Sequence, residues 1–163
     1  MIHLRPLRED DLTLCHDIDR RVSNHPWPLD IFRRGLQKNH WARVAVDEAD
    51  RPYAFCICLL VADELSVLNI AVDQSRQRQG VARHMITAAL EAGRAHGADQ
   101  AFLEVRQSNL PAQALYASMD FNVAGVRENY YPARAACRSD SITEGSPPMR
   151  GREHALIMAR TLL

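Results

Sequence analysis

The sequence predicts an α/β fold in which a mixed, mostly antiparallel sheet is flanked by helices. Three observations lead to this prediction. Short apolar segments with the alternation typical of strands recur along the chain, amphipathic stretches with helical spacing separate several of them, and the chain has 163 residues. That length is typical of one domain, so we expect residues 1–163 to form a single domain.

The N-terminal part of the chain predicts one strand, two helices and then three strands. Ile2 and Leu4 alternate with polar neighbours, as in a short strand. The next segment has an acidic first turn and apolar residues at helical spacing, which are Leu12, Cys15, Ile18 and Val22. A shorter helix is expected over residues 29–36, and extended segments over residues 42–46, 52–61 and 65–72.

The C-terminal part begins with the most regular helical pattern, at residues 81–95. Its apolar stripe consists of Val81, Met85, Ile86, Ala89 and Leu90. Gly97 follows as a candidate left-handed helix stop. We expect a strand at 101–105, a helix at about 111–118, and last strands at 121–127 and 155–160. Residues 132–151 are rich in Pro, Ser and Gly and are predicted to form a long loop, either functional or disordered.

The composition excludes some classes of protein. Lys and Arg together number 20, as do Asp and Glu, so the net charge is zero and a general nucleic-acid binder is disfavoured. The longest nearly apolar run, residues 54–62, is too short to cross a bilayer. The N-terminus has no apolar signal-peptide stretch, so we expect a cytoplasmic protein that binds neither nucleic acid nor membrane directly.

Four cysteines are present: Cys15, Cys56, Cys58 and Cys137. Cys56 and Cys58 are two residues apart in an apolar strand and therefore share one of its faces. No histidine lies at metal-ligand spacing from them. Buried free thiols are the favoured interpretation over a metal site, and Cys137 is expected to be an exposed thiol in the long loop.

The segment between residues 72 and 83 has the features of an anion-binding loop. A strand ends near Val72, and a polar loop with Gly80 and the small Ala82 leads directly into the helix. The first N–H groups of a helix lack internal partners and attract anions, and small residues let the backbone approach a pyrophosphate. An ordinary polar loop explains the same residues equally well. A Walker P-loop is excluded because the Gly-Lys-Ser/Thr ending is absent.

The residues Gln77-x-x-Gly80-x-Ala82 match the acetyl-coenzyme-A signature of the GNAT N-acetyltransferase superfamily, which the chain therefore resembles. The similarity extends in order over most of the chain, from Pro26-Trp27 near the first helices to Gly151-Arg152-Glu153 before the last strand. The chain closely resembles the members that acetylate the N-terminal alanine of a small-subunit ribosomal protein. Further matching segments are 69–73, 103–106, Ser108-Asn109, 114–116 and 127–132.

This resemblance implies acetyl-CoA as co-substrate, no metal, and a fold whose fourth and fifth strands splay apart to hold coenzyme A. The backbone of Ile70, Ala71 and Val72 would pair with the pantetheine arm. Asn109 would hydrogen-bond the cofactor. The pyrophosphate would lie in the loop formed by Gln77, Arg78, Gln79, Gly80, Val81, Ala82 and Arg83.

Two residues are candidates for proton transfer. By alternation, Glu104 shares a strand face with Arg106, and a solvated Glu104–Arg106 ion pair is the simplest interpretation. The resemblance instead implies that Glu104 is the general base and that Tyr116 protonates the leaving thiolate. Without the resemblance, Tyr116 is more simply a structural tyrosine with its ring in the core. No cysteine nucleophile is needed, and Trp27 and Trp41 are expected to pack in the core or a lid.

Two departures from the family pattern stand out. Asp120 occupies a position where the family commonly has a helix-ending glycine, and Asp tolerates the left-handed conformation. The long loop resembles an insertion on the acceptor side. The sequence thus predicts an acetyltransferase acting on a protein N-terminus, a ribosomal protein by resemblance. The alternatives are transfer to lysine or a small amine, and a non-catalytic acyl-CoA-binding module.

Overall fold

The computed structural model describes residues 1–132 and 152–162. Within these ranges the chain has seven strands in a mostly antiparallel arrangement with helices packed on them, so the predicted α/β fold is confirmed. The strands are β1 (His3–Pro6), β2 (His40–Val46), β3 (Pro52–Val61), β4 (Glu64–Val72), β5 (Gln100–Arg106), β6 (Asn122–Pro132) and β7 (Arg152–Thr161). The α-helices are α1 (Leu12–Val22), α2 (Leu29–Arg33), α3 (Val81–Ala95) and α4 (Leu110–Ala117), joined by short 3₁₀ segments at Glu9–Asp11, Arg34–Leu36 and Gln74–Arg76.

The chain divides into two compact units. Unit 1 comprises Met1–Phe102 with Thr161–Leu163, and unit 2 comprises Leu103–Arg160. The division falls within β5, after Phe102. Two expectations depend on how these units are placed relative to one another: that residues 1–163 form a single domain, and that the fourth and fifth strands splay apart. Both stay predictions.

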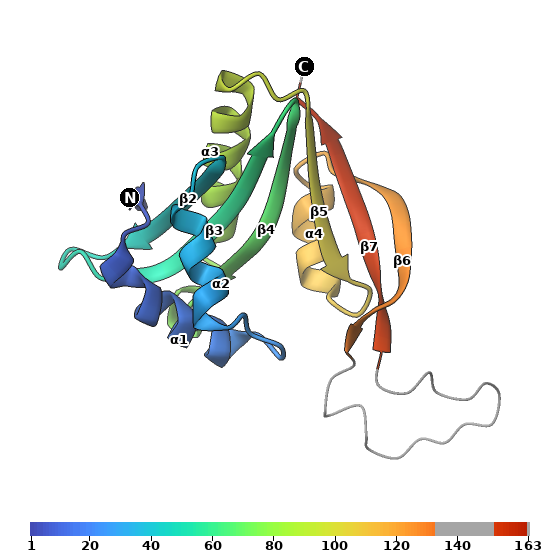
Figure 1. Cartoon of the computed structure of the whole chain (residues 1–163). Coiled ribbons are helices and arrows are strands. Elements are labelled where there is room, and N and C mark those ends of the chain that lie inside the picture. Colours follow the sequence, from blue (N-terminus) through green and yellow to red (C-terminus); the bar gives the residue numbers. More distant parts are fainter. Residues whose placement is uncertain (133–151, 163) are drawn as a thin grey trace, which may run out of the picture. The chain divides into compact units, whose positions relative to one another are not determined.

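Unit 1 is an antiparallel sheet in the order β1-β2-β3-β4. Helices α1 and α2 cover one face of this sheet and α3 covers the other (Figure 1). Residues 54–58 of β3 are all buried because helices cover both faces of the sheet, and Phe55 and Ile57 enter the core beneath α1 and α2. Apolar side chains from both sides of the sheet are therefore removed from water.

Helix α3 has the predicted bounds and the predicted buried stripe. Val81, Met85, Ile86, Ala89 and Leu90 are all buried. The helix ends at Ala95, and the φ of +87° at Gly97, just after the C-cap His96, confirms the predicted left-handed stop. The stripe anchors α3 on the sheet, and this fixes where its N-terminus lies within unit 1.

Unit 2 carries the strand order β5-β7-β6 with α4 packed beside it (Figure 1). Phe121 is almost fully buried, and the preceding Asp120 has φ +66°, which confirms that an aspartate adopts the left-handed conformation there. Strand β6 continues past the expected residue 127, because β7 pairs with it as far as Pro132 opposite Arg152. The predicted long loop, residues 132–151, lies outside the described residues from 133 onward.

None of the described helices is long and apolar enough to span a bilayer.

Candidate active site

The loop of residues 77–83, here called the cofactor loop, owes its shape to backbone conformations that favour glycine. Gly80 has φ +78° and stands at the N-cap of α3. A Cβ built on Gly80 would meet no atom within 4 Å, so the position faces open space and glycine is required by conformation rather than by packing. Arg78 is also left-handed, with φ +61°. The loop thus combines two left-handed residues with a helix start.

The N-terminus of α3 is suited to hold a pyrophosphate. The helix has fifteen residues, and its N-cap is a glycine without a side chain to cap the first N–H groups. Gln77, Arg78, Gln79 and Arg83 are exposed, whereas Val81 is buried and anchors the helix. Backbone donors and two arginines next to open space fit the diphosphate of coenzyme A.

A second set of contacts holds the start of this loop. Asp73 caps the 3₁₀ segment Gln74–Arg76 by accepting hydrogen bonds from Ser75 N (3.1 Å) and Ser75 Oγ (2.8 Å). The Arg21 guanidinium donates to Asp73 at 2.6 Å. The hydrogen bonds from Ser75, and then the nearby Arg21, hold the pKa of Asp73 below its ordinary value. Asp73 therefore stays ionised at neutral pH and fixes the route from β4 into the loop.

The side chain of Gln77 has a structural partner. Its Nε2 donates to the carbonyl of Val72 at 3.0 Å, so the amide folds back on the end of β4. Gln79 Nε2 lies 3.4 Å from the Ser75 carbonyl in the same way. Any contact of Gln77 or Gln79 with coenzyme A would therefore use their backbone N–H groups or require these amides to turn.

Strand β4 contains a bulge just before the predicted pantetheine-binding residues. Asn69 pairs with Ile57, but the next pair is Val67 with Cys58, which leaves Leu68 as the extra residue. Ile70, Ala71 and Val72 then pair regularly with β3, opposite Cys56, Phe55 and Ala54 respectively. A bulge changes the local twist of a strand, and such features are common beside active sites.

Glu104 lies on β5 with its side chain 28% exposed, on the face that alternation predicted. Its carboxylate accepts an ion pair from Arg127 on β6, with 3.1 Å between Arg127 Nε and Glu104 Oε1. The expected Glu104–Arg106 pair is wrong, since Arg106 pairs with Glu153 on β7 at 3.2 Å. Glu104 is thus a partly exposed carboxylate held in place by a guanidinium from another strand.

Tyr116 lies on α4 and is 7% exposed. Its ring packs edge-on against Phe121, with ring centroids 5.9 Å apart and planes at 65°. The ring is therefore part of the core of unit 2, as the simpler interpretation expected. This placement does not conflict with a role for the hydroxyl, because packing of the ring fixes the direction in which the O–H group points.

Asn109 is the N-cap of α4. Its Oδ1 accepts a hydrogen bond from the N–H of Ala112 at 3.2 Å. Gln113 strengthens the same helix start by donating from Nε2 to the carbonyls of Arg106 (3.0 Å) and Gln107 (2.8 Å). Asn109 therefore has a structural task, and its predicted contact with the cofactor would have to use the amide NH₂ group.

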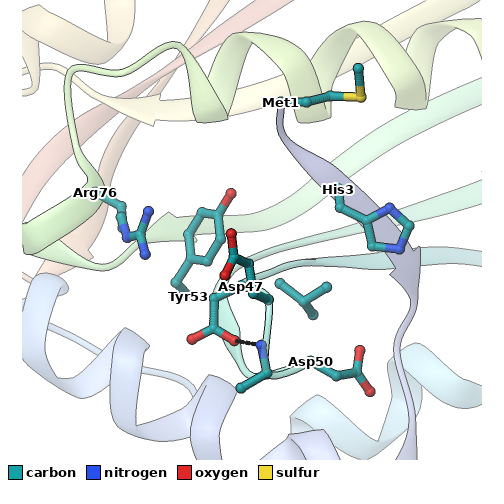
Figure 2. Close-up of a pocket in the computed structure, with 9 residues that line it drawn as sticks. Met1, His3, Asp47, Asp50, Tyr53 and Arg76 are labelled. Atoms are coloured by element: carbon teal, nitrogen blue, oxygen red, sulfur yellow. Dashed lines mark hydrogen bonds between the residues drawn. The ribbon is translucent and has the colours of Figure 1, made fainter.

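A separate surface pocket of about 750 Å³ lies elsewhere in unit 1 (Figure 2). Two of its acidic side chains are already engaged, since Asp47 Oδ1 accepts the N–H of Ala49 at 2.9 Å and Asp50 forms an ion pair with Arg5 at 2.6 Å. The labelled lining residues are Met1, His3, Asp47, Asp50, Tyr53 and Arg76. None of the predicted cofactor or catalytic residues lines it, so we do not regard it as the active site.

The cysteines within the described ranges are buried free thiols, as predicted. Cys15, Cys56 and Cys58 are each fully buried, and the sulfur atoms of Cys56 and Cys58 lie 3.7 Å apart on one strand face. Cys137 falls outside the described residues. Among residues 1–132 and 152–162, no group of three or more His, Cys, Asp or Glu side chains is placed to hold a metal ion.

The two tryptophans pack as expected. Trp27 lies against the core cluster beneath α1 and α2, with its ring centroid 5.5 Å from that of Phe32. Trp41 is 7% exposed and carries the Arg43 guanidinium over its ring at 5.1 Å.

Sequence reasoning missed Arg127 and the buried Asp19. Arg127 is far from Glu104 in sequence, and no local signal connects them. Asp19 did leave a signal, because it stands four residues after Cys15 and three before Val22, within the apolar stripe of the first helix. A carboxylate in such a stripe is unusual enough to be noticed.

The sequence model of the GNAT acetyltransferase family matches residues 7–121. The chain therefore belongs to this family, whose members use acetyl-CoA as acetyl donor. Within the family, the expected resemblance to members that acetylate the N-terminal alanine of a small-subunit ribosomal protein is confirmed. The [ribosomal protein bS18]-alanine N-acetyltransferase of Haemophilus ducreyi is 35% identical over 93% of this chain and 94% of its own length.

Solved structures agree with this placement. The crystal structure of the ribosomal-protein-S18-alanine N-acetyltransferase from Escherichia coli covers 99% of this chain and 94% of its own, with a TM-score of 0.83 and 33% identity. The fold alone is shared with Arabidopsis thaliana NAA60, whose structure in complex with acetyl-CoA has a TM-score of 0.80 and 15% identity, over 99% of this chain and 98% of that one.

Proposed function

We propose that this acetyltransferase transfers the acetyl group of acetyl-CoA to the N-terminal α-amine of a protein, and that the acceptor is the N-terminal alanine of the small-subunit ribosomal protein bS18. The observation that carries this proposal is the similarity over nearly the whole chain to an enzyme named for that reaction. The similarity includes both the cofactor loop of unit 1 and the candidate catalytic residues of unit 2.

The cofactor loop supports the part of the proposal that concerns binding of the acetyl donor, acetyl-CoA. In it, the first N–H groups of α3 and the left-handed Gly80 receive the pyrophosphate, with Arg78 and Arg83 adding charge. The backbone of residues 70–72 on β4 pairs with the pantetheine arm as an added strand would. Acetyl-CoA carries the acetyl group as an activated thioester.

Proton transfer is assigned to Glu104 and Tyr116. Glu104, directly or through a water, takes the proton that the amine loses as its nitrogen bonds to the acetyl carbon. The carbon–sulfur bond breaks, and Tyr116 donates its phenolic proton to the departing thiolate. A phenol with a pKa near 10 is protonated at neutral pH and able to donate. Arg127 fixes the Glu104 carboxylate through their 3.1 Å ion pair.

The chemistry of the acceptor favours an N-terminus over lysine. An α-amine with a pKa of about 7.8 is roughly one quarter neutral at pH 7.4, whereas a lysine with a pKa of about 10.4 is neutral in only about one molecule in a thousand. A single carboxylate base is therefore better matched to an N-terminal α-amine than to a lysine side chain. Transfer to lysine or a small amine is the second candidate, because the family model alone does not distinguish acceptors.

The test is acetyl transfer to peptides that differ only in their first residue. We expect transfer to the free α-amine of a peptide that begins with alanine and carries the bS18 N-terminal sequence. A peptide with a blocked N-terminus and an internal lysine is the control. Transfer to the lysine peptide alone would replace the proposal with the lysine alternative. Binding of acetyl-CoA without transfer to any amine would indicate a non-catalytic module.

A further inference from the structure

His154 on β7 is a half-buried histidine to which the proposed chemistry gives no task. Its Nδ1 atom accepts the backbone N–H of Asn129 on β6 at 3.0 Å. Because a backbone N–H can only donate, Nδ1 carries no proton and the ring is the neutral form protonated on Nε2. His40 and His96 differ, since their Nδ1 atoms lie 3.2 and 2.8 Å from carbonyl oxygens. The ring of His154 therefore serves as a hydrogen-bond acceptor.

The acceptor lies where β6 departs from regular pairing. The register of β6 on β7 shifts between Arg127 and Tyr131. Residues 128–130, here called the β6 bulge, therefore stand opposite His154 alone. In the middle of this bulge Asn129 is left-handed, with φ +54°, a conformation that residues other than glycine seldom adopt. The imidazole thus supplies an acceptor to the bulge where the regular ladder of the two strands is interrupted.

The main chain of His154 holds the other neighbouring strand. Its carbonyl accepts the N–H of Gln107, directly after β5, at 3.1 Å. Strand β7 lies between β5 and β6, and β5 carries Glu104. His154 therefore binds the end of β5 through its backbone and the β6 bulge through its ring, all within unit 2.

The β6 bulge begins directly after Arg127, the ion-pair partner of Glu104. Since β7 separates their strands, the Arg127 side chain crosses β7 to bring Nε within 3.1 Å of Glu104 Oε1. The residue of β7 that pairs with Arg127 is Ala155, and paired residues share a face, so the β7 side chain at this position is only a methyl group. Such a crossing depends on the direction that the backbone gives to Arg127, and the adjoining bulge sets that direction.

We propose that His154 is a positioning residue for proton transfer: its neutral ring holds the β6 bulge at Asn129, and the bulge holds Arg127 against the carboxylate of Glu104. The inference rests on the proposed function, because that function makes Glu104 the general base. His154 acts through the bulge and Arg127 and has no contact with the reacting atoms.

The first experiment needs neither acceptor nor cofactor. Exchange of the Asn129 amide hydrogen is followed by NMR in His154→Asn and His154→Gln, with His96→Gln in unit 1 as the control. An asparagine oxygen takes nearly the position of Nδ1, whereas a glutamine oxygen lies closer to that of Nε2. We expect exchange to quicken tenfold or more in His154→Gln and to stay close to wild type in the other two variants. Wild-type protection of Asn129 in His154→Gln would overturn the proposal.

The second experiment measures kcat with a peptide that begins with alanine. We expect kcat to fall about tenfold in His154→Gln, because a small displacement of a catalytic group is costly, and less than twofold in His154→Asn. The Kd of acetyl-CoA should change less than twofold in both variants, since the cofactor loop is untouched. Equal kcat values in the two variants, whatever their melting temperatures, would make His154 a structural residue only.

A double-mutant cycle tests the route through Arg127. Arg127→Ala removes the guanidinium, so adding His154→Gln to it should lower kcat less than twofold further, because the two substitutions remove one connection. Independent tenfold losses that multiply in the double variant would contradict this route and overturn the proposal.

The remaining outcomes are distinct. If His154→Gln does not fold, the wild-type ring decides: ¹⁵N NMR should find the proton on Nε2, and a proton on Nδ1 would overturn the proposal. Absence of transfer to any peptide by the wild-type chain would overturn the proposed function itself. Wild-type transfer with equal rates in His154→Asn and His154→Gln would overturn only the role of His154.

Discussion

The cofactor loop of unit 1 and the candidate catalytic residues of unit 2 use different parts of the polypeptide. In the proposed cofactor site the backbone provides the donors, through the left-handed Gly80 and the first N–H groups of α3, which no N-cap side chain engages. In unit 2 the proposed proton-transfer groups are side chains, the carboxylate of Glu104 and the phenol of Tyr116. Residues 77–80 and Arg83 of the loop are exposed, whereas Tyr116 is buried and Glu104 is 28% exposed.

This difference determines which substitutions each region tolerates. A site made of backbone N–H groups depends on φ and ψ, so most side chains in the loop can change while the glycine cannot. A site made of side-chain oxygens depends on individual atoms, and removing one oxygen abolishes its chemistry even when the fold is kept. Substitutions that change one property at a time therefore test the comparison.

The largest effect is expected at Glu104. Glu104→Gln keeps the shape of the side chain and removes its basicity, so kcat should fall by about 10²–10⁴ if the carboxylate is a general base. The Kd of acetyl-CoA, measured by calorimetry, should change little because the cofactor loop is untouched. Glu153→Gln is the matched control, since Glu153 also forms an ion pair with an arginine in unit 2. Equal activity in both variants would return Glu104 to the role of a surface carboxylate.

The partner of Glu104 shows where sequence reasoning reached its limit. Alternation on the strand correctly placed Glu104 and Arg106 on one face, but residues two apart in a strand are about 7 Å apart and point the same way. Side chains on neighbouring strands approach to about 5 Å, which is how Arg106 on β5 meets Glu153 on the adjacent β7. Arg127 lies on β6, one strand beyond β7, and reaches Glu104 with its long side chain. The order of the strands depends on the whole topology, and for this reason Arg127 could not be found locally.

The cofactor loop was predictable for the opposite reason. Its conformation is set by Gly80 and by the amphipathic pattern of α3, and both are encoded within about twenty residues of sequence. The same holds for Gly97 and Asp120, whose left-handed conformations follow from local chain geometry. The buried Asp19 was overlooked because its partners, Trp27 and Asn69, come from two other segments.

The second largest effect is expected at Tyr116. Tyr116→Phe removes only the hydroxyl and keeps the ring that packs on Phe121, so the melting temperature and the Kd of acetyl-CoA should change little. The single-turnover rate should fall by about a hundredfold, the low end for a general acid, because a thiolate is a good leaving group that water can also protonate.

Tyr53→Phe is the matched control for Tyr116→Phe, because it removes a phenolic hydroxyl from unit 1. Single-turnover measurements are needed since slow product release can hide a chemical step. A wild-type rate in Tyr116→Phe would assign the proton transfer to another group and leave Tyr116 as a core tyrosine.

A smaller effect is expected in the loop. Gly80→Val forces a β-branched residue to φ +78°, which strains the backbone although no atom blocks the new side chain. We expect the Kd of acetyl-CoA to rise about tenfold, equivalent to about 1.4 kcal/mol. Gly97→Val is a close control, because Gly97 has φ +87° and equally open surroundings at the other end of α3. Equal affinity for acetyl-CoA in both variants would contradict a backbone-made site.

The smallest effect concerns Asn109, where the two kinds of site meet in one residue. Its Oδ1 caps α4, while its amide NH₂ group is the part that a cofactor contact would use. Asn109→Ala removes both and should cost about 1 kcal/mol of stability, the usual value of an N-cap, which lowers the melting temperature by about 2–4 °C for a domain of this size.

Asn109→Asp keeps a capping oxygen and removes only the NH₂ donor. If Asn109 binds the cofactor, Asn109→Asp should retain the wild-type melting temperature and bind acetyl-CoA a few times more weakly. Wild-type affinity in Asn109→Asp would mean that this asparagine serves only the helix, and that unit 2 contributes side chains to proton transfer without using Asn109 to bind the donor.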